Sequence, residues 1–160
     1  MLRRLPLALL LLGCSGGSDP DPATPDARGQ PDAEVIDPTV LRVGGEYSTA
    51  VTLMSSSCTG ITVMNNPTTV AHTPGATTLT LTHVGNSYPG TIMRNGEFAT
   101  TPVAVGPSSE THTLVIGGDF STTGFNATVA AQVSSNGQVQ CAYSVRWVGT
   151  RGSGMNVIPE

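Results

Sequence analysis

The stretch FNATVAAQVSSNGQVQCAYSVRW, residues 125–147, alternates apolar and polar side chains on both sides of Ser-Asn-Gly. Successive side chains of a β-strand point to opposite faces, so this period of two predicts two antiparallel strands, each with one buried face. The residues expected to face inward are Phe125, Ala127, Val129, Ala131 and Val133 on the first strand, and Val139, Cys141, Tyr143, Val145 and Trp147 on the second.

The turn between these two strands is predicted from the same alternation. In a two-residue loop, apolar Val133 would face polar Gln140. We therefore predict a three-residue loop over 135–137, which pairs Ala131 with Cys141.

A second turn is predicted at residues 95–96, where the sequence reads Asn-Gly. This dipeptide is typical of a two-residue type I′ turn, which would place Met93 beside Phe98. Pro74-Gly75 indicates a further turn.

The segment from about residue 39 to the C-terminus contains no amphipathic helix of ten residues, and Thr- and Val-rich runs alternate with Gly, Pro and Asn. We expect an all-β domain, an antiparallel meander of about eight or nine strands that forms an up-and-down barrel, with a two-layer β-sandwich as the alternative. Charged residues make up 11% of the chain, which excludes a coiled coil. Lysine is absent and there are seven arginines, so almost nothing is left from which to build a basic groove for nucleic acid.

The N-terminus has the order of a secretory signal. Arg3 and Arg4 precede an apolar run over 5–12, which is too short to span a bilayer. The run ends in Leu11-Leu12-Gly13-Cys14, which resembles the lipobox of bacterial lipoproteins. The resemblance implies that 1–13 is a cleaved signal peptide and that acyl chains on Cys14 anchor the protein in the membrane. In that family, a residue other than Asp after the cysteine, here Ser15, favours the outer membrane of the cell envelope.

Residues 14–38 are expected to be a tether between Cys14 and the domain at 39–160. The segment is rich in proline and lacks aromatic residues, so it cannot bury a core and is predicted to be disordered. Six acids against Arg28 give the tether a net charge of −5, more negative than the −4 of the whole chain: Asp19, Asp21, Asp26, Asp32, Glu34 and Asp37. The whole chain is also similar to small Thr-rich secreted lipoproteins, which implies a location and no chemistry.

A near-repeat opens three predicted strands, as Gly-Glu-Tyr at 45–47, Gly-Glu-Phe at 96–98 and Gly-Asp-Phe at 118–120. We interpret each copy as a turn glycine, a solvent-facing acid and an aromatic side chain directed into the core. The first copy is also similar to the Gly-x-Trp opening of lipocalins, although tyrosine stands where that family has tryptophan. The resemblance implies that Arg146 or Arg151, near the last strand, packs on the Tyr47 ring.

Two cysteines remain if Cys14 is acylated. Cys58 and Cys141 are an even pair in an oxidising compartment, which favours a disulfide between them. A redox or metal site is less favoured because the sequence has no CxxC motif.

Three histidines share the alternation of apolar neighbours and would form a zinc site if they converged: His72, His83 and His112. However, a loop over 73–76 would pair Val70 with Leu79 and separate His72 from His83 by about 20 Å. We therefore expect no metal and no other cofactor.

The sequence has no GxSxG, HExxH, P-loop or GxGxxG motif, and we expect no enzymatic activity and no catalytic residues. Two functions remain: a structural or interaction domain that contacts other envelope proteins, or a barrel that binds a small apolar ligand. The residues predicted to line such a site are Phe98, Phe125, Tyr143 and Trp147. Interior volume distinguishes the two, and we expect side chains to fill the barrel, which favours the interaction domain.

Overall fold

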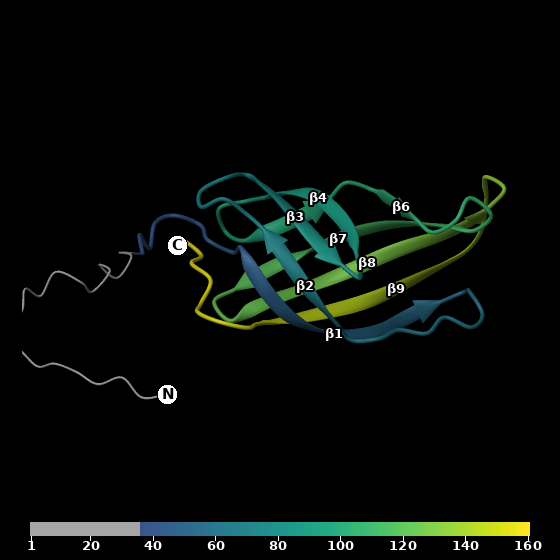
Figure 1. The fold of residues 1–160 in the computed structure, drawn as a ribbon, viewed down its shortest axis with the longest axis horizontal. Helices are drawn as coiled ribbons and strands as arrows, with labels where there is room; N and C mark the ends of the chain where they lie inside the picture. The colour runs from purple at the N-terminus through teal and green to yellow at the C-terminus, as the bar shows by residue number, and fades with distance from the viewer. Residues whose placement is uncertain (1–35) are drawn as a thin grey trace, which may run out of the picture. The chain divides into compact units, whose positions relative to one another are not determined.

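A computed structural model describes residues 36–160, and nine antiparallel strands run through this part of the chain (Figure 1). Residues Ile36–Glu160 form a compact unit with a core of their own, so we expect them to fold by themselves. The strands are β1 (Gly45–Ser56), β2 (Asn66–Ala71), β3 (Thr78–His83), β4 (Asn86–Ile92), β5 (Glu97–Thr100), β6 (Val103–Val105), β7 (Thr111–Ser121), β8 (Gly124–Ser135) and β9 (Gln138–Arg151).

Eight of these strands close into a barrel. Consecutive strands pair within the series β1 to β5 and within the series β7 to β9. The two series are joined into a ring by the pairing of β1 with β9 and of β5 with β7. Strands β5 and β6 lie on the same edge of β7, and Pro102, which has no backbone N–H to donate, stands between them. The structure therefore confirms the up-and-down antiparallel barrel and not the two-layer sandwich. No helix in residues 36–160 is long and apolar enough to cross a membrane.

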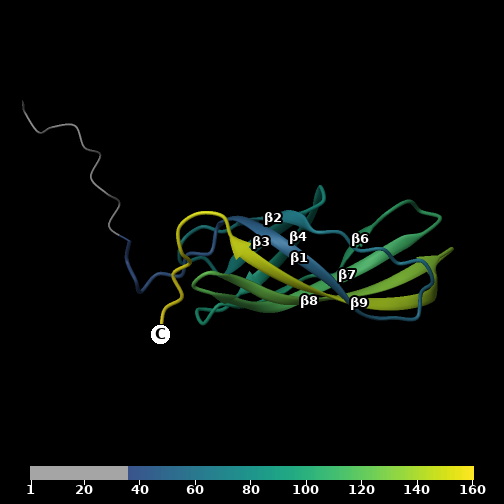
Figure 2. The same cartoon turned by 90° about the horizontal axis from the view of Figure 1, so that it is seen from below.

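The two ends of the barrel differ because the strands differ in length. Strands β1, β7, β8 and β9 have 11 to 14 residues, whereas β2 to β5 have four to seven. Figures 1 and 2 show the long strands running past the short ones on one side. We call the end where β1 begins and β9 ends the closed end, and the end where β1 ends and β9 begins the open end.

The alternation predicted for residues 125–147 is confirmed over most of its length. All five inward positions of β8 are buried, from Phe125 to Val133, as are Val145 and Trp147 on β9. Val139 is 59% exposed instead, because it lies at the tip of the β8–β9 hairpin, next to the turn.

The β8–β9 turn is a two-residue loop, and the prediction of three residues was wrong. Asn136 and Gly137 both have positive φ angles, 50° and 75°, as a type I′ turn requires. The register then shifts between Val133 and Ser134, so that Gln140 is the extra residue of a bulge and Val133 faces Cys141. A bulge inside the strand, rather than a longer loop, keeps the apolar residues on one face.

The β4–β5 turn differs from its prediction in the opposite direction, since a two-residue loop was predicted and a three-residue loop is observed. Gly96 N donates to Met93 O at 3.0 Å and Met93 N donates to Glu97 O at 2.7 Å, which makes a three-residue loop over 94–96. Gly96 has a φ of 89°, the left-handed conformation that the last position of such a loop needs. Phe98 therefore faces Ile92, and the predicted two-residue turn with Met93 beside Phe98 was wrong.

The β2–β3 register also differs from the prediction, since Val70 faces Leu81 and not Leu79. The longer connection between the strands contacts the N-terminal segment, where Gly75 N donates to Leu41 O at 2.9 Å. A contact with a remote segment therefore decides the length of this loop.

Candidate functional site

Aromatic side chains fill the closed end of the barrel. Neighbouring ring centroids lie 5.0 to 6.4 Å apart in tilted and edge-to-face arrangements, the geometry that aromatic pairs prefer. The rings come from four different strands: Tyr47, Phe98, Phe120 and Phe125. Three of them belong to the near-repeat, which confirms that each copy directs its aromatic residue into the core.

Arg151 covers this cluster at the end of β9. Its guanidinium Cζ lies 5.6 Å from the centroid of the Tyr47 ring, and Nη1 donates to the Tyr47 hydroxyl at 2.8 Å. Nη2 donates to Gly44 O at 2.6 Å. Burial raises the pKa of Tyr47, and the arginine charge opposes that shift. Of the two arginines that the sequence offered, Arg151 is the one that packs on Tyr47, whereas Arg146 bonds to Asn126 on the surface.

Segments outside the strands complete the closed end. Arg42 and Val157 exchange both backbone hydrogen bonds at 2.9 Å, so the segments before β1 and after β9 are joined. Asn156 is buried there: its Nδ2 donates to Ser121 O at 2.7 Å, and its Oδ1 lies 2.6 Å from the Tyr47 hydroxyl. These contacts seal the closed end.

The open end contains a hollow of about 290 Å³, which we call the open-end hollow. Its floor is aromatic: the His83 and Trp147 rings lie 4.2 Å apart, and Tyr88 meets Trp147 edge-on at 6.4 Å. Its walls carry mostly apolar side chains, from four strands and from the β1–β2 loop: Val51, Ile61, Val63, Leu114, Val129 and Val145.

A hydrogen-bonded row of three side chains lies at one wall of the hollow. Tyr143, half-buried on β9, places its hydroxyl 3.1 Å from His112 Nδ1, and His112 Nε2 lies 3.3 Å from Glu110 Oε1. Burial raises the pKa of Tyr143, so its phenol is neutral at physiological pH.

A second polar row lies beneath the aromatic floor. Thr49 Oγ1 donates to Thr68 Oγ1 at 2.8 Å, and Thr68 Oγ1 lies 2.9 Å from His83 Nδ1. Burial lowers the pKa of His83, while the Pro67 backbone carbonyl opposes that shift. The His83 imidazole is therefore neutral near pH 7 and packs as part of the core.

A disulfide fastens the loop that borders the hollow. Cys58 and Cys141 are bonded, as predicted, and the bond joins the β1–β2 loop to β9. Ser57 N also donates to Ala142 O at 2.9 Å, and Val51 N donates to Asn65 Oδ1 at 2.8 Å. Both ends of the loop over 57–65 are therefore held against the barrel.

The structure divides the four predicted lining residues between the two ends. Tyr143 and Trp147 line the open-end hollow, but Phe98 and Phe125 pack into the closed-end cluster and do not reach it. The correction follows from the height of each residue along its strand, which alternation alone does not give. Tyr88, His83 and His112 are further ring-bearing residues of the lining, and the only signal for the two histidines was their apolar alternation.

The predicted β2–β3 register kept His72 and His83 apart, and the structure places them at opposite ends of the β2–β3 hairpin. His83 lies opposite Thr68 on β2, while His72 follows β2 at the other end of the hairpin and bonds to Ala76 O at 3.0 Å. Within residues 36–160, no three His, Cys, Asp or Glu side chains come together as metal ligands. Cys14 and residues 1–35 lie outside the described part of the chain.

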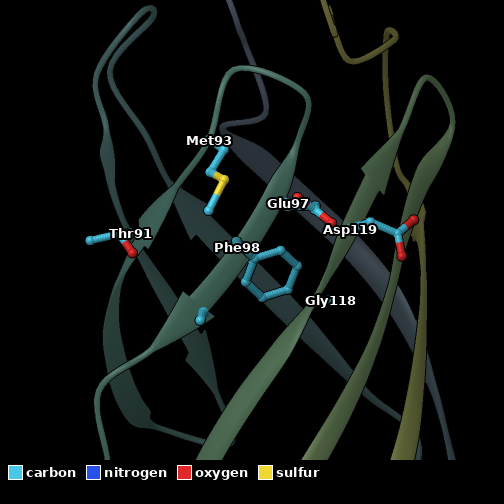
Figure 3. A pocket seen from close by; sticks show the side chains of 7 residues that line it. Thr91, Met93, Glu97, Phe98, Gly118 and Asp119 are labelled. Carbon is cyan, nitrogen blue, oxygen red and sulfur yellow. The ribbon is translucent and has the colours of Figure 1, made fainter.

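A second hollow, of about 450 Å³, lies on the outer side of β4, β5 and β7 (Figure 3). Glu97 and Asp119 border it and face each other in the β5–β7 register, with Met93 and Thr91 on its other side. Like charges directly opposite each other are unfavourable. The lining of this hollow includes no further Asp or Glu and no His or Cys that would hold a metal ion together with these two carboxylates. The open-end hollow is therefore the better candidate site.

Comparison of the chain with protein-family models, with curated proteins and with solved structures found no match.

Proposed function

We propose that this protein is a lipid-anchored binding module of the bacterial cell envelope, whose barrel holds a small, largely apolar ligand in the open-end hollow. The observation that carries the proposal is the contrast between a closed end filled by four aromatic rings and an open end that retains about 290 Å³. The expectation that side chains fill the interior holds at the closed end only.

The lining of the hollow supports this function. Ligand sites are typically concave, mostly apolar, and supplied with a few polar groups that fix orientation. The open-end hollow combines Val51, Val63 and the Trp147 floor with the polar row that ends at Tyr143. Its volume suits one or two fused rings.

The anchor is part of the same proposal. Acylation at Cys14 would hold the domain at the membrane, and the acidic tether would keep it away from anionic headgroups. Intact-mass measurement of the full chain purified from bacterial membranes tests this: we expect cleavage before Cys14 with added acyl mass. A full-length chain without acyl mass would overturn the anchor and leave the hollow untouched.

Residues 36–160, exported with a cleavable signal, test ligand binding, with naphthalene as the probe. The sequence has one tryptophan, and Trp147 forms the floor of the hollow, so its emission reports occupancy. Val51→Phe fills the hollow from its wall, and Val148→Phe makes the same change on a side chain that is 37% exposed. We expect wild type and Val148→Phe to bind naphthalene and Val51→Phe to lose roughly tenfold or more in affinity.

Absence of naphthalene binding, or equal binding by the two variants, would contradict the proposal. Thermal melting of both variants checks that each is folded, since overpacking a core costs about 1 to 3 kcal/mol.

An outer hollow favours a second candidate, an interaction domain that contacts another envelope protein. It has about 480 Å³ over β7, β8 and β9 and is bordered by Val115, Ala130 and Ala142. Val115 is 38% exposed. Failure of the naphthalene test together with weaker co-purification of envelope proteins by Val115→Arg would favour this function.

A further inference from the structure

We infer that the open-end hollow selects neutral ligands that carry a hydroxyl or amine hydrogen-bond donor, and that the Tyr143 oxygen accepts the hydrogen bond from this donor. We infer that the hollow binds carboxylates more weakly. The inference rests on the proposed function, because it names the ligand class of the same hollow.

The row from Glu110 to Tyr143 sets the direction of its hydrogen bonds. A carboxylate only accepts, so His112 Nε2, 3.3 Å from Glu110 Oε1, carries the imidazole proton and donates it. The Nδ1 atom of a neutral imidazole is then an acceptor. The Tyr143 hydroxyl, 3.1 Å from Nδ1, therefore donates its one proton to His112.

This arrangement makes Tyr143 an acceptor toward a ligand. A phenol has one proton, and when that proton is committed to His112 the oxygen offers lone pairs only. Tyr143 and Tyr88 both line the hollow. Burial raises the pKa of Tyr88, and a charge on Tyr143 would raise it further. A ligand with an O–H or N–H group satisfies the oxygen; a ligand without one leaves it unpaired.

Charge in and around the hollow works against anions. The lining residues include no arginine, and the chain has no lysine, so a carboxylate would have neither of these counter-ions there. Glu110 lies at the far end of the row and would repel it. A bound carboxylate would also face the Tyr143 lone pairs with no proton to share, and an unpaired buried charge is costly.

Three probes with the same ring system separate the effect of a hydrogen-bond donor from the effect of a negative charge: naphthalene, 2-naphthol and 2-naphthoate. The binding of each probe to residues 36–160 is measured by equilibrium dialysis at pH 8. We expect 2-naphthol to bind roughly five- to tenfold more tightly than naphthalene, since one net hydrogen bond is worth about 1 kcal/mol. We expect 2-naphthoate to bind more weakly than naphthalene.

Tyr143→Phe removes the hydroxyl oxygen that accepts the hydrogen bond from the ligand and keeps the aromatic ring. In this variant 2-naphthol and naphthalene are expected to bind within about twofold of each other. Tyr88→Phe is the matched control, because Tyr88 also lines the hollow but has no place in the row to Glu110, and the preference for 2-naphthol should remain.

The outcomes distinguish this inference from the proposed function. If none of the three probes binds, the binding function itself fails. If naphthalene and 2-naphthol bind wild type equally, or 2-naphthoate binds most tightly, the hollow binds ligands but the inference is overturned. If Tyr88→Phe and not Tyr143→Phe removes the preference, the assignment of Tyr143 is wrong.

Discussion

The interior of this barrel is packed with aromatic rings at the closed end and hollow at the open end, although both ends are built from the same strands. A hollow of about 400 Å³ at the closed end lies between the N-terminal segment at Leu41 and the β2–β3 loop at Gly75, not among the aromatic rings. At the closed end, segments outside the strands supply Leu41, Val43 and Asn156, and Arg151 joins them to Tyr47. At the open end, the short strands β2 to β5 stop before the long ones, and the segments outside the strands that border the space are the loop over 57–65 and the β3–β4 turn at Val84. The difference shows that a barrel interior is filled by the segments that cover its ends as much as by its strands.

Removing the disulfide is expected to have the largest effect on stability, and it acts at the open end, where the bond fastens the loop over 57–65 to β9. Cys58 and Cys141 are 83 positions apart, and cross-linking a loop of this length stabilises by about 4.5 kcal/mol through the entropy of the unfolded chain. We expect Cys58→Ser with Cys141→Ser to lower the free energy of unfolding by about that amount, measured by urea denaturation of residues 36–160. A loss below about 1 kcal/mol would show that loop closure contributes little.

Replacing Arg151 breaks the closed end alone. Arg151→Met keeps much of the side-chain volume but removes the donors to Tyr47, Gly44 and Asn156. A buried hydrogen bond to a charged group is worth about 1.5 to 3 kcal/mol. Because these bonds are only partly buried, water replaces some of them, and we expect a net loss of roughly 2 to 3 kcal/mol in urea denaturation, with naphthalene binding unchanged.

Arg146→Met is the matched control for that variant. Its guanidinium makes an exposed bond to Asn126 at 3.3 Å, and we expect a loss below about 0.5 kcal/mol. Equal losses from the two variants would contradict the assignment of Arg151 as the residue that covers the aromatic cluster.

The smallest expected effect is a pH dependence from His83 beneath the open-end hollow. Burial lowers its pKa in the folded state, whereas in the unfolded chain histidine titrates near about 6.5. Above that pH both states are neutral and His83 contributes no pH dependence; below it the unfolded state binds a proton that the folded state does not, so stability falls as the pH falls.

The comparison of wild type with His83→Gln isolates this residue, because His72 and His112 are present in both proteins. Between pH 6.5 and 5 we expect the free energy of unfolding of wild type, measured by urea denaturation, to fall more steeply than that of His83→Gln. The difference in slope stays below about 1.4 kcal/mol per pH unit, the limit for one proton. Parallel curves would show that His83 gains its proton equally in both states.

The lengths of the β8–β9 and β4–β5 turns could not be predicted from the sequence. The alternation correctly indicated that Val133 and Gln140 could not face each other. It could not say whether a longer loop or a bulge would prevent the clash, because both restore the same alternation, and the predictions for 135–137 and 95–96 were each the reverse of what the structure shows. Turn type depends on the twist of both strands and on their other neighbours.

The candidate site shows the same limit. Tyr143 and Trp147 were predicted to line an interior site, but so was Phe125, which has the same inward alternation. Height along the barrel separates them, and that depends on the register of every strand pair. The row from Glu110 through His112 to Tyr143 joins residues from two strands and a loop, and no spacing in the sequence marks it.

The sequence by itself determined the local properties of this protein: the all-β class, the inward faces of its strands, the pairing of Cys58 with Cys141 and the aromatic residue of each near-repeat. These follow from the two-residue period of a strand and from the count of cysteines. Tertiary structure alone decided the loop lengths, the choice of Arg151 over Arg146 and the position of the hollow. Each of these depends on contacts between segments far apart in the chain, such as that between Arg42 and Val157, whose register no local pattern specifies.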